Sequence, residues 1–157
     1  MSTIDPRQFR NVMGHFLSGV TVITTRTEAG VRGMTASAFS SLSMDPPLVL
    51  VCVAHKAHMH DLLQVGGRFA VSILSEAQQE LSNHFAGYAP DARVGWDNAW
   101  GQTPVLQGAL AWMDCAVHAV LDGGDHSIVV GRVEALAAHE GAPLAYYRGK
   151  YGKLTSG

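Results

Sequence analysis

Hydrophobic and β-branched residues recur in short, strand-like segments along this 157-residue chain. Residues 20–25 are β-branched throughout, and residues 27–30 form a turn signal before an extended segment resumes at Val31. Residues 109–121 and 126–137 alternate between apolar and polar, and the Asp-Gly-Gly-Asp sequence between them indicates a tight hairpin. The pattern predicts antiparallel strands joined by short turns.

Two apolar runs of strand length add to this set. Pro46 and Pro47 lead into residues 48–54, an unbroken apolar run that predicts a strand buried on both faces. Residues 69–74 predict another strand. The chain therefore holds six or seven strands.

An amphipathic helix is predicted at the start of the chain. Asp5, Pro6 and Gln8 have the order of an N-cap, a first-turn proline and a capping-box glutamine. The helix is expected to end near Gly19. Five apolar residues share one of its faces: Phe9, Val12, Met13, Phe16 and Leu17.

Other helical signals are short. A capping box at Ser75 and Gln78 opens a helix that should end at about Phe85, and residues 61–65 are a short helix candidate before two glycines. Repeated alternation of strand and helix is absent. This favours a mainly β fold, an antiparallel β-barrel with peripheral helices, in one domain over residues 1–157.

Residues 87–104 form a long segment without clear periodicity. Loops of this length are usually functional or part of an interface. Trp96 and Trp100 lie within it and could cover a cleft, whereas Trp112 lies in an alternating strand and fits the core or a dimer interface. Core packing is the expectation for all three tryptophans.

Composition narrows the class of protein. Hydrophobic residues make up 47% and charged residues 15%, which indicates one real core and further apolar surface buried at a subunit interface. The net charge is −2 and the 11 Lys and Arg residues are scattered, so nucleic acid is not expected as a partner. Cys52 and Cys115 lie in apolar runs without C-x-x-C spacing, and no signal peptide or membrane span is apparent. We expect a cytoplasmic protein with free thiols.

The segment with candidate chemistry is residues 33–43, where small and hydroxylated residues follow a predicted hairpin. Small side chains allow a planar ligand to lie against the backbone, and peptide groups can face its polar edge. The same composition also suits a Thr- and Ser-rich strand facing solvent. Motifs for Rossmann, P-loop, hydrolase and zinc-protease sites are absent.

The run GMTASAFSSLSMDPPLVLVCV at residues 33–53 closely resembles the signature of the flavin reductase family with an FMN-binding split barrel. Further pieces match in the same order: HDLL at 60–63, GDHSIVVGRV at 124–133, YYRGKY at 146–151 and the pattern of residues 9–24. The resemblance implies a Greek-key antiparallel barrel, a homodimer, NADH or NADPH as reductant, and FMN or FAD as acceptor. It also implies that a separate monooxygenase receives the reduced flavin.

The resemblance further assigns flavin-binding positions. On the ring side, they are Met34, Thr35, Ala36, Ser37, Ala38, Cys52, Val53 and Ala54, with Ser40 and Ser41 near the ribityl chain. Lys56, Ala57 and His58 occupy the phosphate loop, where family members usually have hydroxyls, so FMN versus FAD stays open. Arg148 and Tyr151 bracket the flavin phosphate or the dinucleotide.

Two assignments retain an alternative. In the family, the histidine of the G-D-H motif contacts nicotinamide, which gives His126 that role, although it could instead cap a turn. Phe85 fits either the helix core or a stacking position on the flavin.

The histidines at 55, 58 and 60 could bind a metal, but few carboxylates or thiols lie nearby, so we expect no metal there and a solvated loop is the other alternative. The expected function is an NAD(P)H:flavin oxidoreductase. The alternatives are a flavin-binding barrel without turnover and a flavin-dependent reductase of another acceptor, such as a ferric chelate or a corrinoid.

Overall fold

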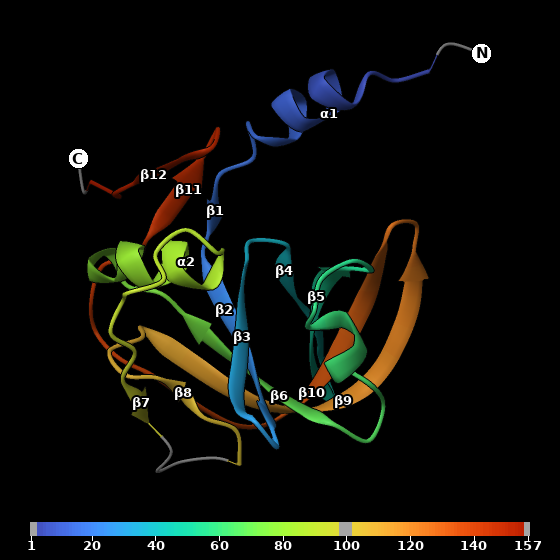
Figure 1. The fold of residues 1–157 in the computed structure, drawn as a ribbon, viewed down its shortest axis with the longest axis vertical. Helices are drawn as coiled ribbons and strands as arrows, with labels where there is room; N and C mark the ends of the chain where they lie inside the picture. The colour runs from blue at the N-terminus through green and yellow to red at the C-terminus, as the bar shows by residue number, and fades with distance from the viewer. Residues whose placement is uncertain (1–2, 98–101, 156–157) are drawn as a thin grey trace.

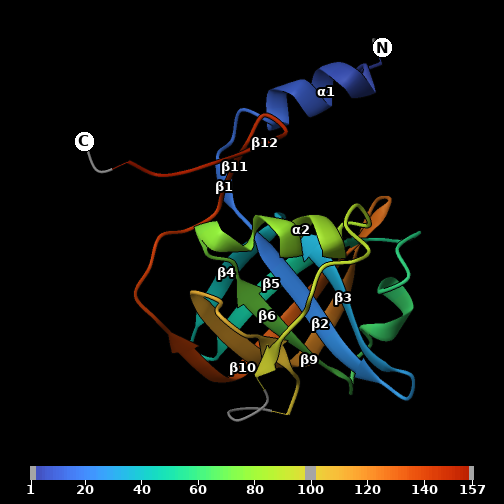
Figure 2. The same cartoon turned by 60° about the vertical axis from the view of Figure 1, so that its left-hand side comes forward.

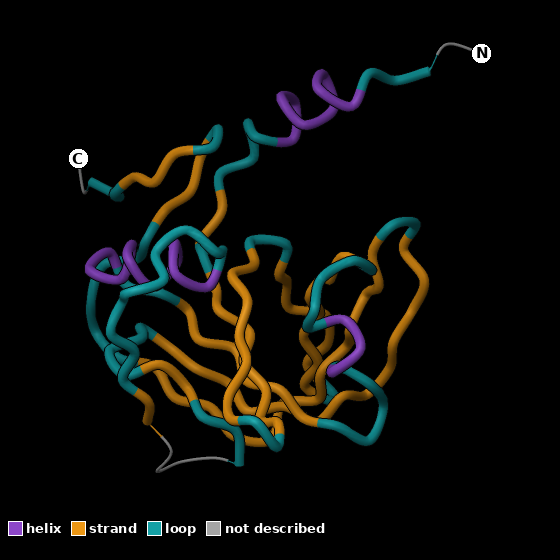
Figure 3. Tube along the Cα trace, in the orientation of Figure 1, coloured by secondary structure: helices purple, strands orange, loops and turns teal. Residues whose placement is uncertain are grey.

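The computed structural model describes residues 3–97 and 102–155. Strands are far more abundant than helices in the described chain, as Figure 3 shows by colour. Seven antiparallel strands form the main sheet in the order β3-β2-β6-β9-β10-β5-β4. They are β2 (Thr21–Thr27), β3 (Gly30–Ala36), β4 (Phe39–Met44), β5 (Pro47–Ala54), β6 (Arg68–Ile73), β9 (Ala111–Gly123) and β10 (His126–Ala138).

The order of pairing is of the Greek-key type. Strands β6, β9 and β10 are neighbours in succession, and β5, which precedes β6 in the chain, lies beside β10. The hairpin from β9 to β10 turns at Gly124 (φ 78°) and Asp125, with Gly123 opposite His126. A glycine with positive φ at the first turn position explains why this sequence makes a two-residue turn.

The sheet curls on itself but does not close. Strands β3 and β4 are its two edges, yet only Ser37 and Ala38 separate them in the chain. Three peptide steps span at most about 11 Å, so the two edges must approach each other at this point. No ladder joins β3 to β4 in the main sheet. The predicted mainly β split barrel is confirmed, and we call the unpaired junction at Ser37 and Ala38 the seam.

The barrel interior is a continuous apolar cluster. Its largest fully buried members are Ile23, Met59, Leu63, Phe69, Val51, Val53, Val71 and Val129. Cys115 lies among them, and burial raises the pKa of its thiol to about 12. Both cysteines are free, as expected from their spacing.

Strand β5 differs from the prediction of burial on both faces. Val49, Val51 and Val53 are buried, but the alternate residues are only half-buried. The reason is that β5 has the barrel interior on one side alone. Leu50, Cys52 and Ala54 therefore form a partly open apolar face.

The opening helix α1 (Pro6–Met13) has Asp5 as its N-cap, but it ends well before Gly19. Gly14 caps its end, and the Gly14 carbonyl accepts from the Arg148 N–H at 2.9 Å. Strand β1 (Ser18–Gly19) then pairs with β11 (Ala145–Tyr147), which pairs with β12 (Lys150–Gly152). The helix stops early because the chain must extend to make this small sheet.

Helix α1 and this small sheet stand away from the barrel in both views (Figures 1 and 2). The apolar residues that α1 carries are exposed, at 58% for Phe9 and 60% for Val12, and so is Phe16 just beyond the helix, at 77%. This surface is not explained by the contacts of a single chain.

Helix α2 (Gln79–Phe85) follows a 3₁₀ turn (Glu76–Gln78) that opens with the predicted Ser75–Gln78 capping box. The predicted helix at residues 61–65 is wrong, because only a 3₁₀ turn (His60–Leu62) forms there. Five residues before two glycines are too few to offset the cost of helix nucleation.

The segment 87–104 contains β7 (Trp96–Asp97), which pairs with β8 (Val105–Leu106). Trp112 is 5% exposed in the core, as expected, and Trp96 packs against the apolar cluster under α2. Trp100 lies outside the described residues. In the described ranges, no helix has the length and apolar character needed to cross a bilayer.

Candidate functional site

The seam presents backbone and small polar groups to solvent. Ser37 and Ala38 are exposed, and the Ala38 carbonyl accepts from the Cys52 N–H at 3.0 Å, which ties the seam to β5. Ser40 and Ser41 continue exposed along β4, and the Ser40 hydroxyl donates to the Ser41 carbonyl at 2.8 Å. The structure thus brings the predicted ring-binding segment beside the half-buried face of β5.

Three of the predicted flavin positions point their side chains into the barrel. Met34, Ala36 and Val53 pack in or against the interior cluster. The Ala36 carbonyl also accepts from the buried Thr21 hydroxyl at 2.6 Å. At the buried positions Ala36 and Val53, a ligand can reach only backbone atoms.

Other predicted residues face α2. The Thr35 hydroxyl donates to the Ser82 carbonyl at 2.6 Å, and the Tyr151 hydroxyl lies 2.6 Å from the Ser82 hydroxyl. A cavity of about 190 Å³ lies here and reaches Ser37 and Tyr146. The structure therefore brings Tyr151 and Thr35 together at one end of the seam.

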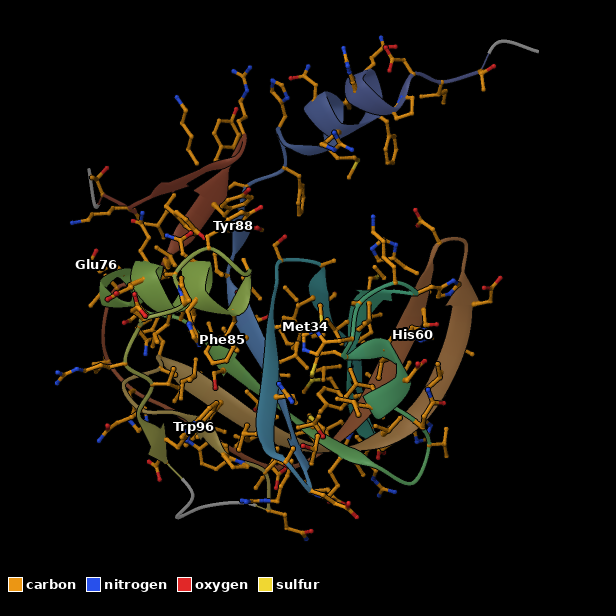
Figure 4. The ribbon with its side chains drawn as sticks, in the orientation of Figure 1. Met34, His60, Glu76, Phe85, Tyr88 and Trp96 are labelled. Carbon is orange, nitrogen blue, oxygen red and sulfur yellow. The ribbon has the colours of Figure 1, made fainter. Side chains whose placement is uncertain are left out.

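Phe85 occupies a packed position on the same side. Its ring contacts Trp96 edge to face at a centroid distance of 6.1 Å, and it lies so close to Gly33 that any larger residue there would clash. Figure 4 shows Phe85 and Trp96 on the α2 side of β3 and Met34 on the other side. This placement agrees with the helix-core alternative for Phe85.

At the other end of β5, side chains form what we call the histidine group: His55, His60, His126, Asp125 and Ser127. His126 lies opposite Ala54 in the β5–β10 ladder. The His60 Nε2 and the Ser127 hydroxyl are 2.8 Å apart, and the His60 Nδ1 lies 3.1 Å from Asp61 Oδ1. The rings of His55 and His60 meet edge to face at 4.9 Å.

His126 is held by its neighbour in the turn. The His126 Nδ1 lies 2.7 Å from Asp125 Oδ1. The hydrogen bond to the His126 ring is the main cause that lowers the pKa of the Asp125 carboxyl, and the electrostatic interaction with the same ring is the second. A carboxylate can only accept, so Nδ1 carries a proton and the neutral ring has Nε2 as an acceptor. Both the turn-capping and the ligand-positioning alternatives fit, because each uses a different nitrogen.

The predicted phosphate loop is anchored by its backbone. The His55 N–H donates to the Asp125 carbonyl at 3.0 Å, and Ala57 packs against the interior cluster. Lys56 and His58 are exposed. In the part of the chain that the structure describes, no three His, Cys, Asp or Glu residues gather as a metal site.

Three cationic side chains lie at the α1 end of the seam, and we call them the arginine group: Arg7, Arg10 and Arg148. All three line a cavity of about 560 Å³ together with Ser37 and Tyr146. Of these three, only Arg148 was predicted from the sequence; Arg7 and Arg10 were not. Their i, i+3 spacing on a predicted helix was a signal that they share a face, but nothing in the sequence placed that face near residue 148.

Residues 13–155 match the flavin reductase like domain family. The chain is 41% identical over 153 residues to the reductase subunit HsaB of a flavin-dependent monooxygenase from Mycobacterium tuberculosis strain CDC 1551 / Oshkosh, covering 94% of this chain and 82% of the relative.

Two solved structures are also similar. One is flavin reductase PheA2 in its native state, with a TM-score of 0.93, 42% identity, and coverage of 98% of this chain and 100% of that one. The other is the NADH:FAD oxidoreductase SgcE6 of Streptomyces globisporus C-1027 in complex with NAD and FAD fragments, with a TM-score of 0.86, 36% identity, and coverage of 99% and 98%. The chain therefore belongs to the flavin reductase like domain family.

Proposed function

We propose that this protein is an NAD(P)H-dependent flavin reductase whose flavin binds at the seam. The observation that carries the proposal is the position of Ser37 and Ala38, which are exposed at the junction of the barrel edges. Ser37 lines the cavity of the arginine group, and Ala38 is bonded to β5, the strand that leads to the histidine group. Family membership and the similarity to an NADH:FAD oxidoreductase support it.

The residues at the seam fit a planar ring with an anionic tail. Backbone groups around Ser37 and Ala38 and the half-buried face of β5 at Cys52 and Ala54 would contact the ring. When bound, a flavin supplies an acceptor for the hydride of a reduced nicotinamide. Peptide N–H groups at the seam would stabilise negative charge on the reduced ring.

His126 is suited to hold the nicotinamide. Asp125 fixes its Nδ1, and in the neutral ring Nε2 can accept a hydrogen bond from a carboxamide NH₂. The residue contributes orientation, since hydride transfer needs no general acid at the carbon.

The exposed apolar face of α1 supports a homodimer. Phe9, Val12 and Phe16 are more than half exposed, and a second copy of the chain would remove this surface from water. We infer that the pair assembles through α1 and that a separate monooxygenase takes the reduced flavin, as the name of HsaB indicates for that relative. The free thiols are consistent with a reducing, cytoplasmic setting.

The decisive assay mixes the purified protein with NADH or NADPH and riboflavin, FMN or FAD, and follows nucleotide oxidation at 340 nm. We expect oxidation that depends on both substrates. Absence of flavin-dependent oxidation would reject the reductase, and flavin retained through gel filtration without turnover would favour a flavin-binding barrel. Sedimentation of wild type against Phe9→Glu tests the dimer, with a shift to monomer expected.

A further inference from the structure

The arginine group is a concentration of positive charge that its surroundings do not neutralise. Arg7 and Arg10 come from α1 and Arg148 from the β11–β12 turn, and no Asp or Glu lines the cavity they share. Over residues 3–97 and 102–155, none of the three guanidinium groups has a hydrogen-bond or ion-pair partner. The neighbouring carboxylate of Asp5 accepts from the Arg7 backbone N–H at 2.9 Å.

The fold holds these three side chains together. One helical turn separates Arg7 from Arg10, which places them on one face of α1. The hydrogen bond from the Arg148 N–H to the Gly14 carbonyl fastens the β11–β12 turn to the end of that helix. Like charges repel, so a cavity that gathers three of them is stabilised when an anion enters it.

Arg148 occupies an unusual backbone conformation for an arginine. Its φ is 51°, and with Gly149 at φ 78° it forms the two-residue turn between Tyr147 and Lys150. Such turns favour Asn, Asp or Gly, because a Cβ in the left-handed region clashes with the neighbouring backbone. The turn therefore places a guanidinium group at a position that backbone preference does not explain.

The cavity is continuous in its lining with the seam. Ser37 and Tyr146 line both the 560 Å³ cavity and the 190 Å³ cavity under α2. A ligand whose ring lies at Ser37 can thus extend a charged tail toward the arginines. Guanidinium groups match phosphate oxygens with paired, charge-assisted hydrogen bonds.

We propose that Arg7, Arg10 and Arg148 form a binding site for the phosphate groups of a nucleotide ligand at the seam. The site takes a phosphomonoester or a diphosphate, carried by the flavin or by the nicotinamide nucleotide. This inference rests on the proposed function, because that function supplies the nucleotides. It makes the arginine cavity, rather than Lys56 and His58 alone, a place where the tail is held.

The test is isothermal titration calorimetry of riboflavin, FMN, FAD and NAD⁺ with the full chain. The variant is Arg7→Gln/Arg10→Gln, and the control is Arg26→Gln/Arg32→Gln, which removes two exposed charges from β2 and β3 outside the cavity. We expect the first variant to weaken phosphate-bearing ligands by roughly 10- to 100-fold and riboflavin by less than about twofold. Raising the salt concentration should shrink the wild-type preference for FMN over riboflavin.

Comparing the four ligands shows whether the bound phosphate belongs to the flavin or to the nicotinamide nucleotide. Loss confined to FMN and FAD assigns the site to the flavin tail, and loss confined to NAD⁺ assigns it to the nicotinamide nucleotide. Equal loss for riboflavin and FMN, no loss beyond the control, or no binding by wild type overturns the site. Arg7→Lys/Arg10→Lys keeps the charge but removes the paired donors, so its affinity for FMN should fall between those of wild type and the Gln variant, and an affinity as low as that of the Gln variant would reject a contribution of charge.

The same data separate this inference from the proposed function. Phosphate-dependent binding that needs the arginines, in a protein that does not oxidise NADH, would leave the site standing and reject the reductase. Normal NADH oxidation and unchanged binding in Arg7→Gln/Arg10→Gln would do the opposite.

Discussion

The arginine group and the histidine group are built in different ways. The arginines are permanently charged and have no partner over the described residues, whereas the histidines are titratable and are bonded to Asp125, Asp61 and Ser127. A group without partners is available to an external anion, and a group with partners has its orientation fixed in advance. We infer that the arginine group supplies attraction and the histidine group supplies position.

The largest expected effect comes from filling the seam at Ser37 with a large side chain. Ser37→Trp places an indole where Ser37 lines both cavities, so flavin affinity should fall more than about 100-fold. Glu28→Trp, in the exposed β2–β3 turn, is the matched control and should have no effect. Fluorescence titration with FMN measures both, and normal affinity in Ser37→Trp would remove the seam from the site.

Removing the His126 side chain should affect the binding of NADH and leave the binding of flavin nearly unchanged. His126→Ala is expected to raise the KM for NADH about 10-fold or more and the KM for flavin less than twofold, because only the nicotinamide loses a contact. His118→Ala, an exposed histidine on β9, is the control. An equal change in both KM values, or none, rejects the assigned role.

A smaller effect should follow from loosening the phosphate loop. The 2.8 Å contact of His60 with Ser127 joins this loop to the strand of His126. His60→Ala and Ser127→Ala should each weaken flavin binding by roughly two- to tenfold, and the double variant no more than either single one. Strictly additive losses in a fluorescence titration would show that the two residues do not act as a pair.

The smallest effect concerns pH. His126 lowers the pKa of Asp125, so this carboxylate contributes to stability above its ordinary pKa of about 4 and loses the contribution as pH falls through the lowered value. The difference in melting temperature between wild type and Asp125→Asn should therefore persist from pH 7 to 5, shrink as pH falls below about 4, and vanish only below the lowered pKa of Asp125. The difference should be small, since Asp125 is fully exposed. A difference that vanishes near neutral pH would contradict the pairing.

Local chemistry made much of the fold predictable. The β-branched run at 20–25, the Gly124 turn and the Ser75–Gln78 box each specify their own element. The early end of α1 was not predictable, because it depends on the Gly14 contact with Arg148, more than 130 residues away in the chain. The one-sided burial of β5 likewise depends on which strands surround it.

The candidate site was likewise predictable only in part. Residues 33–43 carry a local signature of small and polar side chains, so the sequence identified the segment. It could not show that Met34, Ala36 and Val53 point inward or that the Thr35 hydroxyl is bonded to α2, because strand register decides both. Arg7 and Arg10 could not be assigned to the site from the sequence, because only the folded small sheet places Arg148 at the same cavity.

The most direct measurement of the central claim is NMR chemical-shift mapping of backbone amides as FMN is added. The account predicts the largest changes at Ser37, Ala38 and Cys52, with further changes at Arg148. A cavity of about 460 Å³ lined by Trp112, Leu136 and His139 offers a competing location on β9 and β10. Changes concentrated there, with the seam unaffected, would contradict the account.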